Sequence, residues 1–227
     1  IRPVNELEFE FDESTGTITK YKGNNPIVSI PRKIKGVDVK HIGDYAFNKI
    51  NKPYEEKLKT LIIPEGIETI GKGSFINNRL STVKLPSTLK EIGEEAFRFQ
   101  YKDSSYGSTA FNINIPENIK IIKNLTFESA GSPLLIEEAS GLERIEKEAF
   151  TYNKKIEINA YNLKEIEDGA FGNNRSMDFE YAKVYTNKDT KLKSKTGEYL
   201  INPALVTINF IDAKDDENIL KIGLKYG

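Results

Sequence analysis

The sequence predicts an α/β repeat protein, a solenoid with short strands and short helical turns that begins with a β-hairpin cap. Two observations lead to this fold class. One six-residue word recurs along the chain, and short runs of alternating apolar residues precede its clearest copies. Units this short cannot bury an apolar face alone, so stacked neighbours must share one core.

The recurring word ends in phenylalanine. Its clearest copies are Ile-Gly-Asp-Tyr-Ala-Phe at 42–47, Ile-Gly-Lys-Gly-Ser-Phe at 70–75 and Ile-Gly-Glu-Glu-Ala-Phe at 92–97. An isoleucine stands five residues before every phenylalanine, and a small residue stands directly before it. The six phenylalanines are Phe47, Phe75, Phe97, Phe127, Phe150 and Phe171. We therefore expect six stacked coils, with each phenylalanine buried between its neighbours.

Each coil is expected to contain one strand and one tight turn. Leu61 and Ile63 alternate with polar neighbours before Pro64, which is typical of a strand with one buried face that ends at the proline. The isoleucine, small residue and phenylalanine of the word suit one helical turn with a single face inward. Amides follow three residues after the phenylalanine in four copies, where they could bond turn backbone: Asn78, Gln100, Asn153 and Asn174.

These residues resemble the BspA-like branch of leucine-rich repeats. The segment Leu58-Lys-Thr-Leu-Ile-Ile-Pro-Glu-Gly-Ile-Glu-Thr-Ile-Gly-Lys-Gly-Ser-Phe75 fits its signature almost throughout, and the resemblance covers about residues 26–174. It implies a leucine-rich-repeat solenoid. Members are mostly surface or secreted proteins of bacteria and some protists, and several are adhesins that bind host matrix proteins. The family brings no conserved catalytic residues. Repeats five and six lose the proline and glycine, and the shifted pattern of Ile156 and Ile158 leaves the strand register there open.

The two ends differ from the repeats. Apolar and polar residues alternate in 7–11 and again in 17–21, and turn-forming residues lie between the two segments. Residues 1–25 are therefore expected to form a hairpin cap before the array at 26–175. Residues 176–227 are expected to hold a degenerate repeat and a C-terminal cap, with a strand at 204–211. The alternative is that this segment begins a further module.

Two insertions leave the same point of the coil, after Phe47 and after Phe97. They are expected to project from one edge, and their aromatic residues suit an adaptable contact surface. We predict binding through Tyr54, Phe99, Tyr101 and Tyr106. The alternative is that Phe99 and Tyr101 only cover the apolar edge.

The outward residues of the strands form a second candidate surface. This row is polar and carries no strong charge: Thr60, Ile62, Thr82, Lys84, Asn112 and Asn114. Repeat proteins commonly bind through such extended surfaces, although solvation alone explains the same pattern equally well.

The sequence offers little for catalysis. The chain has one histidine, His41, and no cysteine, which excludes disulfides, thiolate chemistry and cysteine-based zinc sites. No nucleophile elbow, phosphate loop or calcium loop occurs. The net charge of −1 gives no sign of nucleic-acid binding, and no apolar run approaches the roughly 20 residues of a membrane span. No enzyme activity, metal or cofactor is expected.

The expected function is therefore binding. With the family resemblance, the sequence predicts an extracellular or bacterial cell-surface module of the adhesin type, a monomer that engages a host or neighbouring-cell protein. Two alternatives stay open: a structural spacer within a larger surface protein, and a glycan-binding module.

Overall fold

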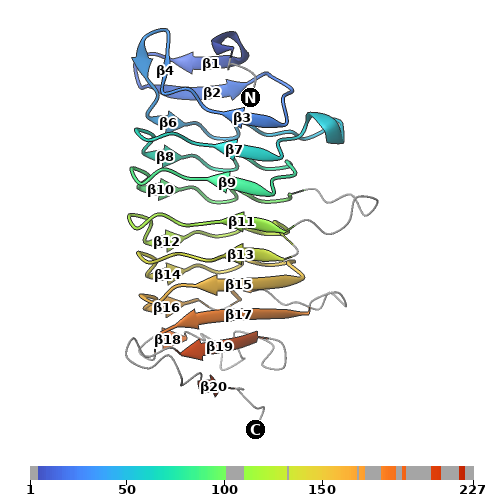
Figure 1. The fold of residues 1–227 in the computed structure, drawn as a ribbon, viewed down its shortest axis with the longest axis vertical. Helices are drawn as coiled ribbons and strands as arrows, with labels where there is room; N and C mark the ends of the chain where they lie inside the picture. The colour runs from blue at the N-terminus through green and yellow to red at the C-terminus, as the bar shows by residue number, and fades with distance from the viewer. Residues whose placement is uncertain are drawn as a thin grey trace.

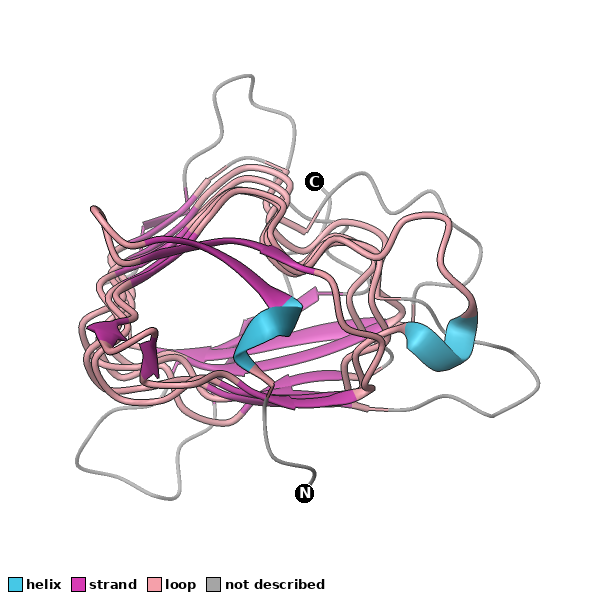
Figure 2. Ribbon diagram, turned by 90° about the horizontal axis from the view of Figure 1, so that it is seen from above, coloured by secondary structure: helices cyan, strands magenta, loops and turns pink. Residues whose placement is uncertain are grey.

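The computed structural model describes residues 5–100, 110–131, 133–167, 169–171, 180–187, 191–192, 206–210 and 220–222, the last three segments by their backbone only. The coils stack along the long axis of the molecule (Figure 1). Seen from above, they superimpose around a common interior (Figure 2). We number the coils one to six by their phenylalanines, from Phe47 to Phe171.

One wall of the stack is a nine-stranded sheet with the order β20-β19-β17-β15-β13-β11-β9-β7-β3. Neighbouring strands run parallel, except for the antiparallel pair β19 and β20. The strands are β3 (Ile27–Ser29), β7 (Thr60–Ile62), β9 (Thr82–Lys84), β11 (Phe111–Ile113), β13 (Leu134–Ile136), β15 (Lys155–Asn159), β17 (Tyr181–Thr186), β19 (Val206–Phe210) and β20 (Leu220–Ile222). The strand predicted at 204–211 is thus β19.

A second wall consists of two-residue strands, of which all but the last contain the isoleucine of the repeat word. They are β6 (His41–Ile42), β8 (Thr69–Ile70), β10 (Glu91–Ile92), β12 (Ile121–Ile122), β14 (Arg144–Ile145), β16 (Glu165–Ile166) and β18 (Lys191–Leu192). Together with β1 (Phe9–Asp12) and β2 (Thr17–Tyr21), they form two sheets, β1-β2-β6-β8-β10 and β12-β14-β16-β18. In coil one, extra residues form the small antiparallel pair β4 (Lys33–Ile34) and β5 (Val37–Asp38).

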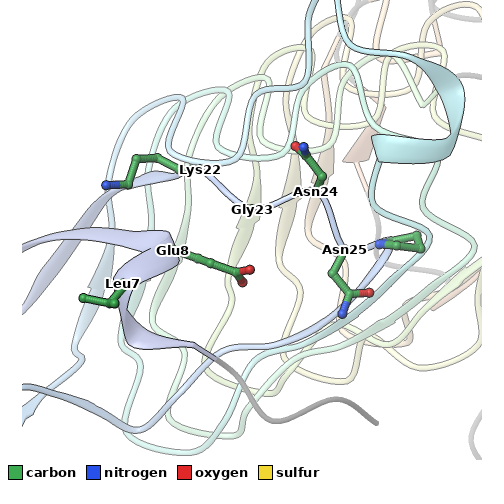
Figure 3. A pocket seen from close by; sticks show the side chains of 7 residues that line it. Leu7, Glu8, Lys22, Gly23, Asn24 and Asn25 are labelled. Atoms are coloured by element: carbon green, nitrogen blue, oxygen red, sulfur yellow. The ribbon is translucent and has the colours of Figure 1, made fainter.

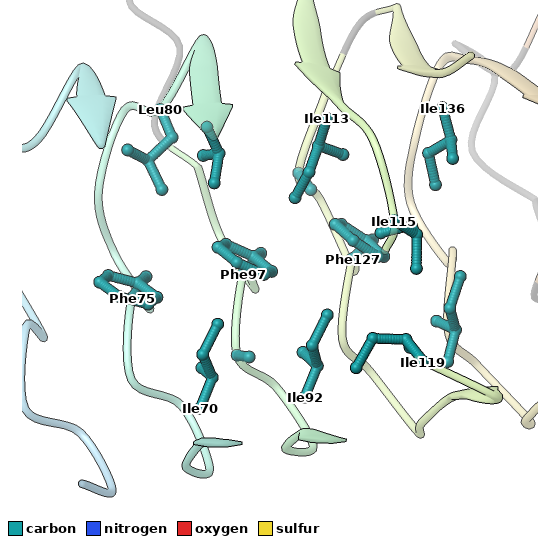
Figure 4. Close-up of a cluster of buried hydrophobic side chains, with 14 of the residues drawn as sticks. Ile70, Phe75, Leu80, Ile92, Phe97, Ile113, Ile115, Ile119, Phe127 and Ile136 are labelled. Atoms are coloured by element: carbon teal, nitrogen blue, oxygen red, sulfur yellow. The ribbon is translucent and has the colours of Figure 1, made fainter. Parts of the chain in front are cut away.

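The phenylalanines form a continuous column through the core, which confirms the repeat alignment. All six side chains are fully buried. Their ring centroids are 5.0 Å apart between coils one and two, and 5.5 Å apart at each later step. Figure 4 shows Phe75, Phe97 and Phe127 stacked beside Ile70 and Ile92. Each ring is therefore desolvated by both neighbouring coils, so no coil has a core of its own.

The predicted helical turns are wrong, and with them the α/β class: the stack is a β-solenoid. The described helices are two short 3₁₀ segments, η1 (Glu6–Glu8) and η2 (Tyr54–Glu56), both outside the repeat word. The residue two before every phenylalanine has a left-handed backbone, with φ between 55° and 70°. These residues are Tyr45, Gly73, Glu95, Leu125, Glu148 and Gly169. A left-handed residue cannot continue a right-handed helix, so the word folds as a short strand followed by a turn.

The predicted hairpin cap is confirmed as β1 (Phe9–Asp12) and β2 (Thr17–Tyr21). Strand β2 pairs with β6 and so covers one edge of the short-strand wall. The Tyr21 ring stacks on Phe47 with centroids 5.0 Å apart, which extends the aromatic column into the cap. Leu7 lies in η1 rather than in the first strand and is 81% exposed.

The register of coil six, which the sequence leaves open, is regular in the structure. Ile156 pairs with Leu134 and Ile158 with Ile136, and all four side chains are buried. One residue fewer separates Ile158 from Ala160 than separates Ile136 from its counterpart Ala139. The missing residue is therefore absorbed at the corner after the strand, and the inward face of the sheet is kept.

Candidate binding surface

The backbone after each buried phenylalanine is held by amide side chains. The Asn78 amide donates to the carbonyl oxygens of Phe47 and Phe75, each at 2.9 Å, and its oxygen accepts the N–H of Leu58 at 2.9 Å. Gln100 repeats this arrangement one coil later, with 3.0 Å bonds to the carbonyls of Phe75 and Phe97. Both amides are buried. The predicted stacking of amides is confirmed for these two coils.

Asn153 forms the third step of this ladder. Its amide donates to the carbonyls of Phe127 and Phe150 at 2.7 and 2.9 Å, and its oxygen accepts the N–H groups of Ala130 and Gly131. Asn174, the fourth predicted amide, lies outside the described residues. Because each amide binds two successive coils, the ladder fixes this side of the solenoid and gives it a rigid backbone.

Directly beside the ladder, in coils two to five, one residue per coil points outward from a left-handed backbone. These residues stand two after the phenylalanine, with φ between 51° and 62°: Asn77, Phe99, Ser129 and Tyr152. Backbone bonds such as Ser129 N–H to the Thr151 carbonyl at 2.9 Å keep them in one row. We call this row, together with Ile50, Tyr54 and Arg79 of the adjoining coils, the ladder edge. A left-handed backbone is costly for bulky residues such as Phe99 and Tyr152, and such strain is concentrated at functional sites in proteins.

The first insertion supplies part of the ladder edge. Its 3₁₀ helix η2 carries Tyr54, and the Arg79 guanidinium carbon lies 4.3 Å from the Tyr54 ring centroid. A pocket of about 240 Å³ opens between the insertion and the next coil. Its lining consists of Ile50, Asn51, Lys52, Tyr54, Lys57 and Asn77. Ile50 is 58% exposed, so an apolar side chain stands at the rim of a polar hollow.

Two buried lysines fix the insertion from inside. The Lys57 ammonium donates to the carbonyls of Lys49 and Asn77 at 2.7 and 2.8 Å. The Lys49 ammonium donates to the Gly23 carbonyl and lies 4.9 Å from the Tyr21 ring centroid. Burial lowers the pKa of both lysines from the ordinary range. These bonds hold the insertion, and with it Tyr54, against the stack.

Phe99 also lies on the ladder edge, half-buried beneath the Arg98 guanidinium, whose carbon is 4.3 Å from the ring centroid. Arg98 is itself held by Glu95 at 2.9 Å and by the buried carboxylate of Glu128. The structure therefore places Tyr54 and Phe99 on one edge. Tyr101 and Tyr106, the other two predicted site residues, lie outside the described residues.

Sequence reasoning missed Tyr152, which is 59% exposed on the same edge. It missed Arg79 and Ile50 as well. Tyr152 follows Phe150 by two residues, as Phe99 follows Phe97. The spacing was thus visible, but the position holds lysine, asparagine, phenylalanine, serine or tyrosine in different coils, so no shared residue type marked it.

The outward face of the nine-stranded sheet forms the second predicted surface. Thr60, Thr82 and Asn112 lie in register across β7, β9 and β11, with their side chains outward. Towards the C-terminal coils, the Tyr181 hydroxyl donates to Glu157 at 3.0 Å, and Lys183 lies 3.6 Å from the same carboxylate. Burial and this carboxylate raise the pKa of Tyr181. At this end of the face, the charges of Glu157 and Lys183 are therefore paired with each other.

A polar hollow of about 610 Å³ lies where the hairpin meets β3 (Figure 3). Its lining consists of Leu7, Glu8, Lys22, Gly23, Asn24, Asn25 and Pro26. The Asn25 side chain accepts the N–H of Ile27 at 2.9 Å, so it serves the local backbone. The hollow carries one charge of each sign, and none of its residues is repeated along the stack.

Nothing in the described residues resembles a catalytic centre. His41 lies in β6, where its Nδ1 is 2.8 Å from the Thr69 hydroxyl of the next coil. No group of three His, Asp or Glu residues in the described segments could hold a metal ion. Within the same segments, no helix is long and apolar enough to cross a membrane.

Comparison with known proteins agrees with the repeat. A family model described as BspA type leucine rich repeat region, with six copies, matches residues 21–104 and 102–193. No curated protein sequence matches the chain. Leucine-rich-repeat domains are generally non-enzymatic scaffolds for protein interaction, and no enzyme family is indicated.

Three solved structures are similar to this chain at low sequence identity. The leucine rich repeat protein TpLRR of T. pallidum is 17% identical over 81% of this chain and 85% of its own, with a TM-score of 0.46. The pneumococcal vaccine antigen PcpA is 18% identical over 81% of this chain and 45% of its own, with a TM-score of 0.46. A leucine rich cell surface protein of Faecalibacterium prausnitzii is 14% identical over 91% and 93%, with a TM-score of 0.29.

The family match covers more than half of the sequence, and its copies fall on the coils that share the phenylalanine column and the amide ladder. On this evidence, the chain belongs to the BspA-type leucine-rich-repeat family.

Proposed function

We propose that this chain is a non-enzymatic binding module of a bacterial cell-surface or secreted protein, which engages a host or neighbouring-cell protein through the ladder edge. The observation that carries the proposal is the row of outward side chains at left-handed positions, Phe99 and Tyr152 above all. The backbone beneath this row is fixed by buried amides, so the row is presented to a partner with little loss of entropy.

The chemistry of the edge suits a protein partner. Tyrosine, phenylalanine and arginine supply large contact area and are enriched among the residues that dominate binding energy. The stacked pair Tyr54 and Arg79 offers a flat apolar face with a cationic rim. Ile50 stands beside the small pocket, which could receive one side chain of the partner. The array at 26–175 would supply this surface, with residues 1–25 and 176–227 at its ends.

A binding screen tests the proposal. The purified chain is immobilised and exposed to a panel of extracellular-matrix and mucosal proteins, and dissociation constants are measured by biolayer interferometry. For any partner found, the double variant Phe99→Ala with Tyr152→Ala should weaken binding by about tenfold or more, because each removes an aromatic anchor at about 1–2 kcal/mol.

The matched control is a double variant on the sheet face, Thr82→Ala with Asn112→Ala, which should leave binding unchanged. Loss of binding in this control with retention in the ladder-edge variant would move the site to the sheet. A chain that binds no member of the panel would favour the structural spacer instead. Binding seen only on a glycan array would favour the glycan-binding alternative.

A further inference from the structure

One corner of the coil stack is open. At four junctions, the residue after the short strand donates its N–H to the isoleucine carbonyl of the preceding coil. These bonds are Gly71 to Ile42, Gly93 to Ile70, Glu146 to Ile122 and Glu167 to Ile145, with N···O distances of 2.8, 2.8, 2.9 and 2.9 Å. Between coils three and four, both fully described at this corner, the Lys123 N–H makes no such bond to the Ile92 carbonyl.

A second bond is missing at the same corner. At the other four junctions, the residue three positions before the one just described donates its N–H to a backbone carbonyl of the preceding coil. These bonds are Glu68 to Lys40, Lys90 to Glu68, Glu143 to Lys120 and Lys164 to Glu143, with N···O distances of 2.8 to 2.9 Å. Between coils three and four, both described at this corner, the Lys120 N–H makes no such bond to the Lys90 carbonyl. Strands β10 and β12 consequently belong to different sheets.

Several other contacts across this junction are kept. Phe97 and Phe127 stack at the usual 5.5 Å, and the Phe97 N–H donates to the Thr126 carbonyl at 3.0 Å. Strand β9 pairs with β11 in the long sheet. On the ladder edge, the ion pair of Arg98 with Glu128 joins the two coils. The opening thus lies in the short-strand wall, opposite the phenylalanine column, the pairing of β9 with β11 and the Arg98 ion pair.

Two modes of stacking meet at this corner. In coils one to three, glycine lets successive backbones touch: a Cβ built at Gly93 would lie 2.6 Å from the carbonyl carbon of Gly71. In coils five and six, a glutamate stands in the glycine position. Its carboxylate accepts a backbone N–H of the preceding coil, Asn124 to Glu146 at 3.0 Å and Lys147 to Glu167 at 3.1 Å.

Lys123 fits neither mode. Its Cβ cannot take the place of the glycine hydrogen, and its ammonium cannot accept a backbone N–H. Its side chain instead reaches across the gap to Glu91 at 2.5 Å. The amide ladder is interrupted at the same coil, where Ala130 occupies the position of Asn78 and Gln100. Two separate features therefore divide coils one to three from coils four to six.

We propose that the corner between β10 and β12 is a flexure built into the solenoid, held open by Lys123, at which the two blocks of three coils tilt against each other. The long sheet, the phenylalanine column and the Arg98 ion pair act as the hinge side. The tilt opens and closes the short-strand wall while the ladder edge stays in register. This inference goes beyond the proposed function and does not depend on it.

Hydrogen exchange of the intact chain, followed by NMR at single amides, tests the open corner. The protection factor of the Lys123 amide should be at least about tenfold lower than those of its counterparts Gly93 and Glu146. The Lys120 amide should likewise be less protected than Lys90 and Glu143. Equal protection at all these positions would overturn the proposal.

Two variants at the same position test its cause. Lys123→Gly should let the coils approach and raise protection at residues 120 and 123. Lys123→Ala also removes the ion pair with Glu91 but keeps a Cβ, and should leave the corner open. If both variants close the corner, or neither does, Lys123 does not hold it open through its Cβ.

Distance distributions between spin labels test the tilt. The chain lacks cysteine, so label pairs can be placed cleanly in one column of exposed or half-exposed residues. The pair at residues 68 and 120 spans two junctions across the corner, whereas the pairs at 40 and 90 and at 120 and 164 span two junctions within one block. The first distribution should be broader than the other two and should narrow in Lys123→Gly. Three equal widths would contradict a flexure.

Discussion

At the scale of single residues, the amides of the ladder do the work that a cap does at the end of a helix. Asn78 alone serves three buried backbone groups, the carbonyls of Phe47 and Phe75 and the N–H of Leu58. These groups cannot reach water, so the amide completes their hydrogen bonding in the coils where it stands. The requirement is local, which is why spacing from the phenylalanine was enough to predict it.

Replacing Asn78 by alanine should therefore be costly. Asn78→Ala leaves the Leu58 N–H and the Phe47 carbonyl without their amide bonds, and we expect a loss of about 2–4 kcal/mol in the free energy of unfolding. Urea unfolding followed by circular dichroism measures it. Asn112→Ala on the exposed sheet face is the control and should stay within about 0.5 kcal/mol of the wild type. A loss below about 1 kcal/mol for Asn78→Ala would show that the amide is not needed.

At the scale of elements, the turn of the repeat word depends on a residue whose identity varies. The isoleucine, the small residue and the phenylalanine recur, and the structure buries all three in every coil. The small residue is alanine, serine or threonine. The left-handed position between them holds Tyr45, Gly73 or Leu125 in different coils. Since no single residue type marks this position, spacing alone favoured a helical turn. The same reasoning could not find Tyr152, whose position is set by backbone geometry rather than by a shared letter.

Gly73 and Gly169 provide a test whose sign separates a turn from a helix. Both have left-handed backbone, with φ of 56° and 70°. In a helix, replacing glycine by alanine would stabilise the fold by roughly 0.5–1 kcal/mol. In the observed turn, Gly169→Ala should destabilise it by about 1–2 kcal/mol through backbone strain.

Gly73→Ala should cost more than Gly169→Ala, because the new Cβ would also overlap the Tyr45 ring, whereas at Gly169 the nearest atom is 3.8 Å away. Thermal unfolding of the two variants beside the wild type measures both effects. A stabilised variant at either position would support the helical turn.

At the scale of the whole molecule, the phenylalanine column joins six coils, none of which has a core of its own, into one solenoid. Each ring is covered by the coils on both sides, so the core is continuous from Tyr21 of the cap to Phe171. In coils two to five, the same geometry sends the residue two positions later outward, whereas Lys49 at this position in coil one is buried. The stacking of the coils could be predicted from sequence because the phenylalanine recurs at the same place in each repeat. The composition of the ladder edge could not, because it arises only when separate coils are stacked.

The central claim is that buried and outward positions alternate in this fixed way along the stack. Phe97 and Phe99 test it most directly, since they are two residues apart, one fully buried and one on the ladder edge. The measurement is the free energy of unfolding in urea for Phe97→Ala and Phe99→Ala. The account predicts a loss of about 3–5 kcal/mol for Phe97→Ala and about 1 kcal/mol or less for Phe99→Ala. Equal losses, or a larger loss at Phe99, would contradict it.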